Sequence, residues 1–214
     1  MGQKVNPIAF RIKTTPTSLG WQSSWYAEKG EYKKLLLEDY KIRQTLQKKL
    51  SSAGIVSIRI ERSAKKIKLI LVVSRPGLVI GRGGKELENT KNEVQKIIAN
   101  KNTKTNIDIQ VEEFRNTDLS AKLIAEKISY QLAKRMPYRR VVLSAIEKSM
   151  AAGVKGIKVI LSGRINGAEI SRQEKFHQGQ VPLSTIKANI DYAQIPCLTR
   201  SGYIGVKVYL CLTN

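Results

Sequence analysis

The chain has 214 residues and carries 38 Lys and Arg side chains against 17 Asp and Glu side chains, a formal net charge of +21. Hydrophobic residues make up 42% of it, which excludes wholesale disorder and suffices for two modest domains with cores of their own. The excess of cations runs along the whole chain, so we expect a polyanionic partner, usually nucleic acid, over much of the surface. No apolar run approaches the roughly 20 residues that span a bilayer, so no membrane partner is expected.

The residues that carry enzyme chemistry are scarce. His177 is the only histidine, and neither an acidic pair nor a nucleophile motif surrounds it. Cys197 and Cys211 are too few for a disulfide framework or a zinc cluster, and we expect both to be reduced, apolar residues in strands. The first residues, 1–7, lack the apolar core of a signal peptide, so the protein is expected to stay where it is made. We expect no catalytic residue, no metal and no cofactor.

The first elements follow from hydrophobic periodicity. Residues 1–30 contain Gly, Pro, Ser and Thr without a sustained period, which predicts an extended basic arm. Helical spacing over 32–53 predicts a helix that Gly54 ends. Alternation over 55–61 predicts a half-buried strand, and the nearly continuous apolar run over 67–73 predicts a buried one.

The most informative stretch is Gly81-Arg82-Gly83-Gly84-Lys85, between a short helix that Pro76 opens and an amphipathic helix from Lys85 to about 98. Glycines and a cation at a helix start suit a phosphate. A Walker loop is excluded because Val79 replaces its first glycine, and a dinucleotide fingerprint is excluded because Glu86 replaces its third. What remains is Gly-x-x-Gly, either a KH clamp on single-stranded RNA or a plain turn between two helices.

The context of the glycine loop favours the KH interpretation. A third strand over 107–112 completes the order helix, strand, strand, helix, Gly-x-x-Gly, helix, strand. This is the order of a type II KH domain, so residues 31–115 are predicted to form one, with a three-stranded sheet and helices on one face. The predicted RNA-binding loop consists of Gly81, Arg82, Gly83, Gly84 and Lys85.

The remaining residues, 116–214, predict a second domain. Residues 116–118 (Asn-Thr-Asp) offer N-cap chemistry to a helix that Pro137 ends, and a second helix runs to about 152. Strands are predicted over 157–165, 168–176, 185–192 and 203–212, the first two joined by a hairpin turn at Asn166-Gly167. The fold class is therefore α+β, with two helices against a mostly antiparallel sheet. Asp191 and Glu169 are expected to serve as ion-pair partners.

Short segments over nearly the full length carry a family resemblance. They are Gly2-Gln3-Lys4-Val5-Asn6-Pro7, Arg75-Pro76-Gly77 through Gly84, Gly156-Ile157-Lys158-Val159, Ser162-Gly163-Arg164, Gly167-Ala168-Glu169-Ile170, Val181-Pro182-Leu183, Ala188-Asn189-Ile190-Asp191-Tyr192 and Gly202-Tyr203-Ile204-Gly205-Val206-Lys207-Val208. With them the chain resembles the ribosomal protein S3 (uS3) family of the small ribosomal subunit, in its bacterial or organellar form. Several of these segments are peculiar to that family.

The resemblance implies a structural constituent of the small-subunit head that binds 16S-type rRNA beside proteins S10, S14 and S2. It also implies contact with mRNA, beside S4 and S5, where the message enters, and help in unwinding its duplexes. The family's basic residues there correspond to Arg139 and Arg140. The next two positions of that basic cluster are Leu143 and Ser144 here, so this chain has fewer cations at the site. That both arginines simply anchor rRNA is the alternative. The side chains expected to contact rRNA are Lys4, Arg11, Lys13, Arg164, Arg172 and Lys187.

Two other functions compete with this one. One is a free-standing KH-domain RNA chaperone or ribosome assembly factor, which would not require the family segments that this chain carries in its second domain. The other is a nucleic-acid-cleaving enzyme, which would require catalytic groups that the sequence does not offer. Stoichiometric presence in salt-washed small subunits separates the ribosomal role from the chaperone. The ribosome would be that of a bacterial cytoplasm, or of a plastid or mitochondrion if the gene is organellar.

Overall fold

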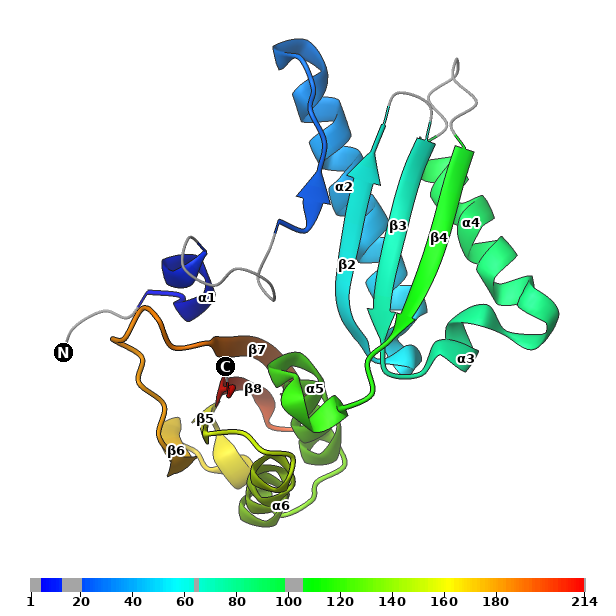
Figure 1. The fold of residues 1–214 in the computed structure, drawn as a ribbon. Helices are drawn as coiled ribbons and strands as arrows, with labels where there is room; N and C mark the ends of the chain where they lie inside the picture. Colours follow the sequence, from blue (N-terminus) through cyan, green and yellow to red (C-terminus); the bar gives the residue numbers. More distant parts are fainter. Residues whose placement is uncertain (1–4, 13–20, 64–65, 99–105, 214) are drawn as a thin grey trace. The chain divides into compact units, whose positions relative to one another are not determined.

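The computed structural model describes residues 5–12, 21–63, 66–98 and 106–213 (Figure 1). They divide into two compact units. The central unit comprises residues 21–115, and the C-terminal unit comprises residues from 116 onward together with the N-terminal residues 5–12. Among the described residues, no helix is both long and apolar enough to cross a bilayer.

The central unit has the element order that the sequence predicts. Its elements are β1 (Ser23–Ser24), α2 (Lys29–Lys49), the 3-10 turn η1 (Ser51–Ala53), β2 (Ile55–Arg62), β3 (Lys66–Val73), α3 (Pro76–Ile80), the 3-10 turn η2 (Arg82–Gly84), α4 (Lys85–Ile98) and β4 (Asn106–Glu113). The strands lie in the order β1-β2-β3-β4, with β2 and β3 antiparallel and the other two pairs parallel. The predicted three-stranded sheet thus gains a short fourth strand from within residues 1–30.

The core of the central unit lies between the sheet and its two long helices, which lie behind the sheet in Figure 1. Helix α2 buries Ile42 and Leu46 at helical spacing. Helix α4 buries Thr90 and Val94, one turn apart. Strand β3 is nearly continuously buried because it lies between two other strands and beneath the helices.

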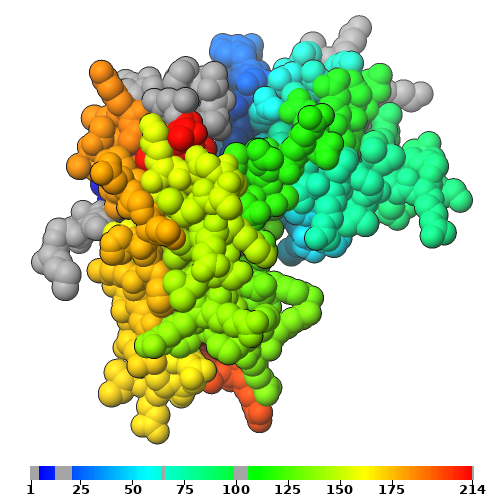
Figure 2. Space-filling model, turned by 60° about the horizontal axis from the view of Figure 1, so that its bottom comes forward, coloured from blue at the N-terminus to red at the C-terminus, as the bar shows by residue number. Residues whose placement is uncertain are grey.

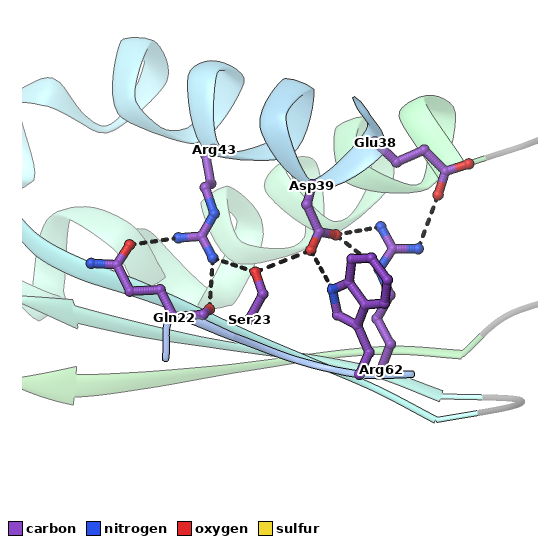
Figure 3. Close-up of polar contacts among 7 residues, drawn as sticks. Gln22, Ser23, Glu38, Asp39, Arg43 and Arg62 are labelled. Atoms are coloured by element: carbon purple, nitrogen blue, oxygen red, sulfur yellow. Dashed lines mark hydrogen bonds and ion pairs between the residues drawn. The ribbon is translucent and has the colours of Figure 1, made fainter. Parts of the chain in front are cut away.

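A buried carboxylate, Asp39 of α2, fastens the segment before α2 to the sheet (Figure 3). Its Oδ2 accepts hydrogen bonds from Trp25 Nε1 at 2.8 Å and from Ser23 Oγ at 3.2 Å. Its Oδ1 accepts from the guanidinium of Arg62, which also pairs with Glu38 at 2.9 Å. The ion pair is enclosed, since 4% of the Asp39 side chain and 7% of the Arg62 side chain is exposed.

Arg43, one turn farther along α2, completes this attachment (Figure 3). Its guanidinium donates to the Gln22 carbonyl at 2.6 Å, to Gln22 Oε1 at 3.1 Å and to Ser23 Oγ at 2.8 Å. It also donates to the carbonyl of Ile58 in β2. Residues 22–25 therefore belong to the central unit, and the segment predicted as one arm over 1–30 is divided between the two units.

The C-terminal unit packs two helices on an antiparallel sheet. Its elements are α1 (Pro7–Arg11), the 3-10 turn η3 (Thr117–Leu119), α5 (Ala121–Ala133), α6 (Tyr138–Ala151), β5 (Gly156–Gly163), the 3-10 turn η4 (Ile165–Gly167), β6 (Arg172–Gly179), β7 (Ile190–Thr199) and β8 (Gly202–Cys211). The strand order is β6-β5-β8-β7, antiparallel throughout. Apolar residues of α5 and α6 form one core with those of β5 and β8. The predicted free, apolar cysteines are confirmed, since Cys197 in β7 and Cys211 in β8 are buried thiols.

The predicted hairpin at Asn166-Gly167 is wrong in its extent. Both residues have the left-handed backbone that such a turn requires. The ladder nevertheless resumes only where Gly163 pairs with Arg172, so residues 164–171 form a loop. The carbonyl of Ala168 accepts a hydrogen bond from Arg164 Nε at 2.8 Å, which holds the loop in place of strand pairing.

Arg11, which the sequence analysis expects to contact rRNA, is wholly buried. Its guanidinium donates to the carbonyls of Pro7 at 3.0 Å, Leu183 at 2.7 Å and Thr185 at 2.9 Å. Burial lowers the pKa of this guanidinium. The strand predicted over 185–192 begins only at Ile190. Two carbonyls that precede it, those of Leu183 and Thr185, accept hydrogen bonds from Arg11.

Helix α5 is capped by a residue distant in sequence. The predicted capping residues 116–118 contribute instead to a 3-10 turn, and Ser120 at the N-cap makes no side-chain capping bond. Asp191 Oδ2 accepts from the backbone N–H of Ala121 at 2.8 Å, and its Oδ1 accepts from that of Tyr192 at 2.9 Å. Burial raises the pKa of Asp191, and the two amide donors oppose that rise. The predicted ion pair of Asp191 does not occur among the described residues, and its carboxylate accepts from two backbone amides instead.

We predict that Asp39→Ala destabilises the central unit by about 3 kcal/mol, because it leaves the buried Arg62 with one fewer acceptor. Both tryptophans lie in this unit, so their fluorescence during urea denaturation measures its free energy of unfolding. Glu112→Ala is the matched control. It breaks the Arg59–Glu112 pair, whose side chains are nearly half exposed, and we expect a loss below about 1 kcal/mol. Equal losses would contradict the fastening role of Asp39.

Candidate nucleic-acid interface

The glycine loop has a backbone that only glycine adopts readily. Gly81 has φ 70° and ψ 179°, a region almost restricted to glycine, and a Cβ there would lie 2.8 Å from Glu86 Cβ. Gly83 and Gly84 also have positive φ. Buried Val79 anchors the loop on one side, and α4 begins on the other at Lys85. The loop is thus a defined turn with Arg82 and Lys85 exposed.

Charges next to this loop weaken it as a phosphate clamp. The first turn of α4 carries Glu86 and Glu88, and both are exposed. These carboxylates complement the positive end of the helix dipole, which a bound phosphate would otherwise use. Their two negative charges offset those of Arg82 and Lys85. The loop therefore has the backbone shape of a turn that binds single-stranded RNA, but it carries little net positive charge.

The arginine pair of the C-terminal unit lies at the start of α6. Arg139 and Arg140 occupy its first turn, which holds no acidic residue, and both side chains are exposed. Cations at a helix N-terminus oppose the dipole, so helix stability gives no reason for them. Arg139 lies against Tyr138, with its guanidinium carbon 5.8 Å from the ring centroid and its Nε 3.2 Å from the hydroxyl. The Tyr138 hydroxyl in turn donates to Glu174 Oε1 at 3.0 Å.

The surface beside this pair includes an exposed apolar side chain. Leu143, one turn farther along α6, has half of its surface exposed, and Ser144 is half-buried. Within the part of the chain that the structure describes, no carboxylate is within ion-pair distance of Arg139 or Arg140. The pair therefore keeps its full charge available to an anion.

The other predicted rRNA contacts have different surroundings. Arg164, Arg172 and Lys187 are exposed on loops or at the start of β6. Arg172 lies 3.6 Å from Glu174, and that pair is open to solvent on the arginine side. Lys4 and Lys13 lie outside the described residues.

Two further exposed arginines were not among the predicted contacts. Arg135 lies in the turn between α5 and α6, and Arg200 lies at the tip of the β7–β8 hairpin. The turn residues Arg200-Ser201-Gly202 would have indicated this hairpin if the strand predicted over 185–192 had been placed where β7 lies. Among the described residues no group of His, Cys, Asp and Glu side chains is arranged to hold a metal ion.

Comparison with known proteins points to one family. The family described as "KH domain" matches residues 41–119, and "Ribosomal protein S3, C-terminal domain" matches residues 128–210. The chain is 42% identical to small ribosomal subunit protein uS3 of Desulfatibacillum aliphaticivorans over 210 residues, which cover 98% of this chain and 92% of the relative. It is 46% identical to uS3 of Clostridioides difficile over 212 residues, or 99% and 75% of the two chains. The relative from Rhodopirellula baltica is 45% identical over 98% of this chain and 88% of its own.

We predict that Gly81→Ala destabilises the central unit by about 2 kcal/mol, because alanine is strained in this backbone and its Cβ meets Glu86. Gly83→Asn is the control, since asparagine tolerates the left-handed φ of 62° and the position has open space around it. Tryptophan fluorescence in urea gives both free energies of unfolding. A Gly81→Ala protein as stable as Gly83→Asn would show that the loop backbone is not held as described.

Proposed function

The chain belongs to the ribosomal protein S3 (uS3) family, structural components of the small ribosomal subunit, and on this premise we propose that Arg139 and Arg140 contact mRNA where the message enters. Family membership also implies rRNA binding and removes the nuclease alternative, because the relatives are ribosomal proteins and not enzymes. It favours a ribosomal constituent over a free-standing RNA chaperone.

The observation that carries the proposal is the arginine pair without acidic partners at the start of α6. Two adjacent guanidinium groups can bind successive phosphates of one strand, and their exposure leaves them able to release it. Transient binding suits a strand that must keep moving. The apolar Leu143 in place of a third cation favours a weaker hold on mRNA than a larger basic cluster would give.

We propose that rRNA is recognised by charge and shape over the remaining basic surface. Arg164, Arg172 and Lys187 are exposed on the C-terminal unit and suit phosphate contacts, which position a protein on folded RNA without reading its sequence. We also propose that the protein contacts ribosomal proteins S10, S14 and S2 in the subunit, and S4 and S5 near the arginine pair. The glycine loop is a secondary contact, because Glu86 and Glu88 offset its cations.

We predict that Arg139→Ala with Arg140→Ala leaves subunit assembly intact but slows translation through an mRNA hairpin relative to an unstructured message. The physical reason is the loss of two phosphate contacts that hold the strand during unwinding. The double variant Lys148→Ala with Lys175→Ala removes the same charge from exposed positions of the same unit and should translate both messages normally. An unchanged translation rate on the hairpin message would contradict the proposed mRNA contact. Loss of subunit assembly would indicate that the two arginines anchor rRNA instead.

We predict that Arg82→Ala weakens binding of single-stranded RNA only slightly. If Arg82 contacts one phosphate, the slope of log affinity against log salt becomes shallower by about 0.7. Binding titrations at several salt concentrations measure that slope. Lys48→Ala, an exposed cation on α2 of the same unit, should leave it unchanged. A change as large as that for several lost contacts would contradict the secondary role of the loop.

A further inference from the structure

The C-terminal unit contains a cavity of about 260 Å³, and of the residues proposed to contact RNA, Arg164 lines it. Three connections line it: the α5–α6 turn, the β5–β6 loop and the β7–β8 hairpin. Figure 2 shows the segments near residues 135, 165 and 200, coloured green, yellow and orange-red, at the lower end of the view. Two of the connections nearly touch, since a Cβ on Gly167 would lie 3.3 Å from Ser201 Oγ.

Each of the three connections contributes one arginine to the rim of the cavity. They are Arg135, Arg164 and Arg200, and all three side chains are exposed. Arg164 is oriented by its Nε bond to the Ala168 carbonyl. No acidic residue lines the cavity, and none within the described ranges pairs with these arginines. The rim therefore attracts an anion from three sides.

The floor of the cavity is apolar and rigid. Leu132, Leu161, Ile165 and Ile204 line it, and all four belong to the buried core. Tyr138 adds an aromatic ring, held edge-on to Phe176 at 6.4 Å between ring centroids and fixed by its bond to Glu174. Apolar groups beneath a ring of cations suit a ligand with one flat apolar part and one anionic part.

Two turns with left-handed residues border the cavity. Of the residues that the structure describes, the two non-glycine ones with positive φ are Arg135 at 61° and Asn166 at 58°, and both line this cavity. Asparagine tolerates this backbone, and Arg135 follows the C-cap of α5, where a left-handed residue commonly ends a helix. Both turns that border the cavity therefore have a defined local geometry.

The size of the cavity restricts its ligand. Pockets for drug-sized ligands run from about 300 to 1,000 Å³, so a cavity of about 260 Å³ suits a smaller group such as a single nucleobase. An unstacked base on an aromatic and apolar surface, with its phosphates on arginines, is a common mode of single-stranded RNA recognition.

We propose that this cavity binds one unstacked nucleotide of RNA, with the base on Tyr138 and the apolar floor and the flanking phosphates on Arg135, Arg164 and Arg200. The inference rests on the proposed RNA-binding function and gives it a site beside Arg139, which contacts the same tyrosine. The nucleotide comes either from rRNA or from mRNA, and the chemistry of recognition is the same for both.

Filling the cavity tests for the base. Ser201→Trp and, independently, Met136→Trp add a large neutral side chain at its half-buried and exposed lining positions. The full chain is titrated with a single-stranded oligonucleotide and with an abasic strand of equal length and charge. We expect each variant to weaken binding of the first RNA on the order of tenfold and to leave the abasic RNA unaffected. Arg200→Ala should weaken both RNAs, and Lys148→Ala neither.

The source of the nucleotide is distinguished in reconstituted small subunits. A benzophenone side chain introduced at position 136 is irradiated in subunits with and without bound mRNA. Crosslinks to rRNA or to mRNA both support the proposal and name the source. Crosslinks only to protein, no crosslink to RNA, or equal effects of Ser201→Trp and Met136→Trp on the two oligonucleotides would overturn it. Arg139→Ala with Arg140→Ala should keep the base dependence, so this proposal and the mRNA role fail separately.

Discussion

A guanidinium that leaves water must find acceptors inside the protein, and this constraint organises both units of the chain. Arg62 meets the carboxylates of Asp39 and Glu38. Arg43 meets backbone and side-chain oxygens of residues 22–23 and β2. Arg11 meets a set of carbonyls before β7. Each of the three joins segments distant in sequence, because arginine has several donors in a fixed plane. In a chain with an excess of +21 charges, some of the cations therefore hold the protein together.

The same constraint separates structural arginines from those that remain for RNA. Arg139 and Arg140 lie in the first turn of a helix, which holds no acidic residue and where the dipole disfavours them. Arg135 and Arg200 lie on turns and are exposed, and neither forms an ion pair within the described residues. A cation that makes no stabilising contact within the protein and lies close to other cations lowers the stability of the fold through charge repulsion. A bound polyanion would offset this cost, which is why the proposed interface is placed at these positions and not at the most basic stretches of sequence.

Several segments that identify the family have structural roles here. Asn6 caps α1 by accepting a hydrogen bond from Ile8 N–H, and Pro7 follows at the first helical position. Pro182 and Leu183 supply carbonyls to Arg11. Asp191 of β7 caps α5, although the two are far apart in the sequence. The glycine loop, by contrast, has the backbone shape of a clamp for single-stranded RNA, but Glu86 and Glu88 leave it little net positive charge. Asn6, Pro7, Pro182, Leu183 and Asp191 thus mark the family and also hold the fold together.

The sequence alone determined the α+β class, the KH element order, the glycine turn and the helices of the C-terminal unit. These depend on local periodicity and on residues with restricted backbones, such as Pro137 and Gly81. Tertiary structure decided the burial of Arg11, the capping role of Asp191, the start of β7 and the cavity between three turns. Each of these joins residues far apart in the chain, so no local pattern contains it. Whether an arginine faces solvent or carbonyls is settled by which segments pack around it, and only the fold brings those segments together.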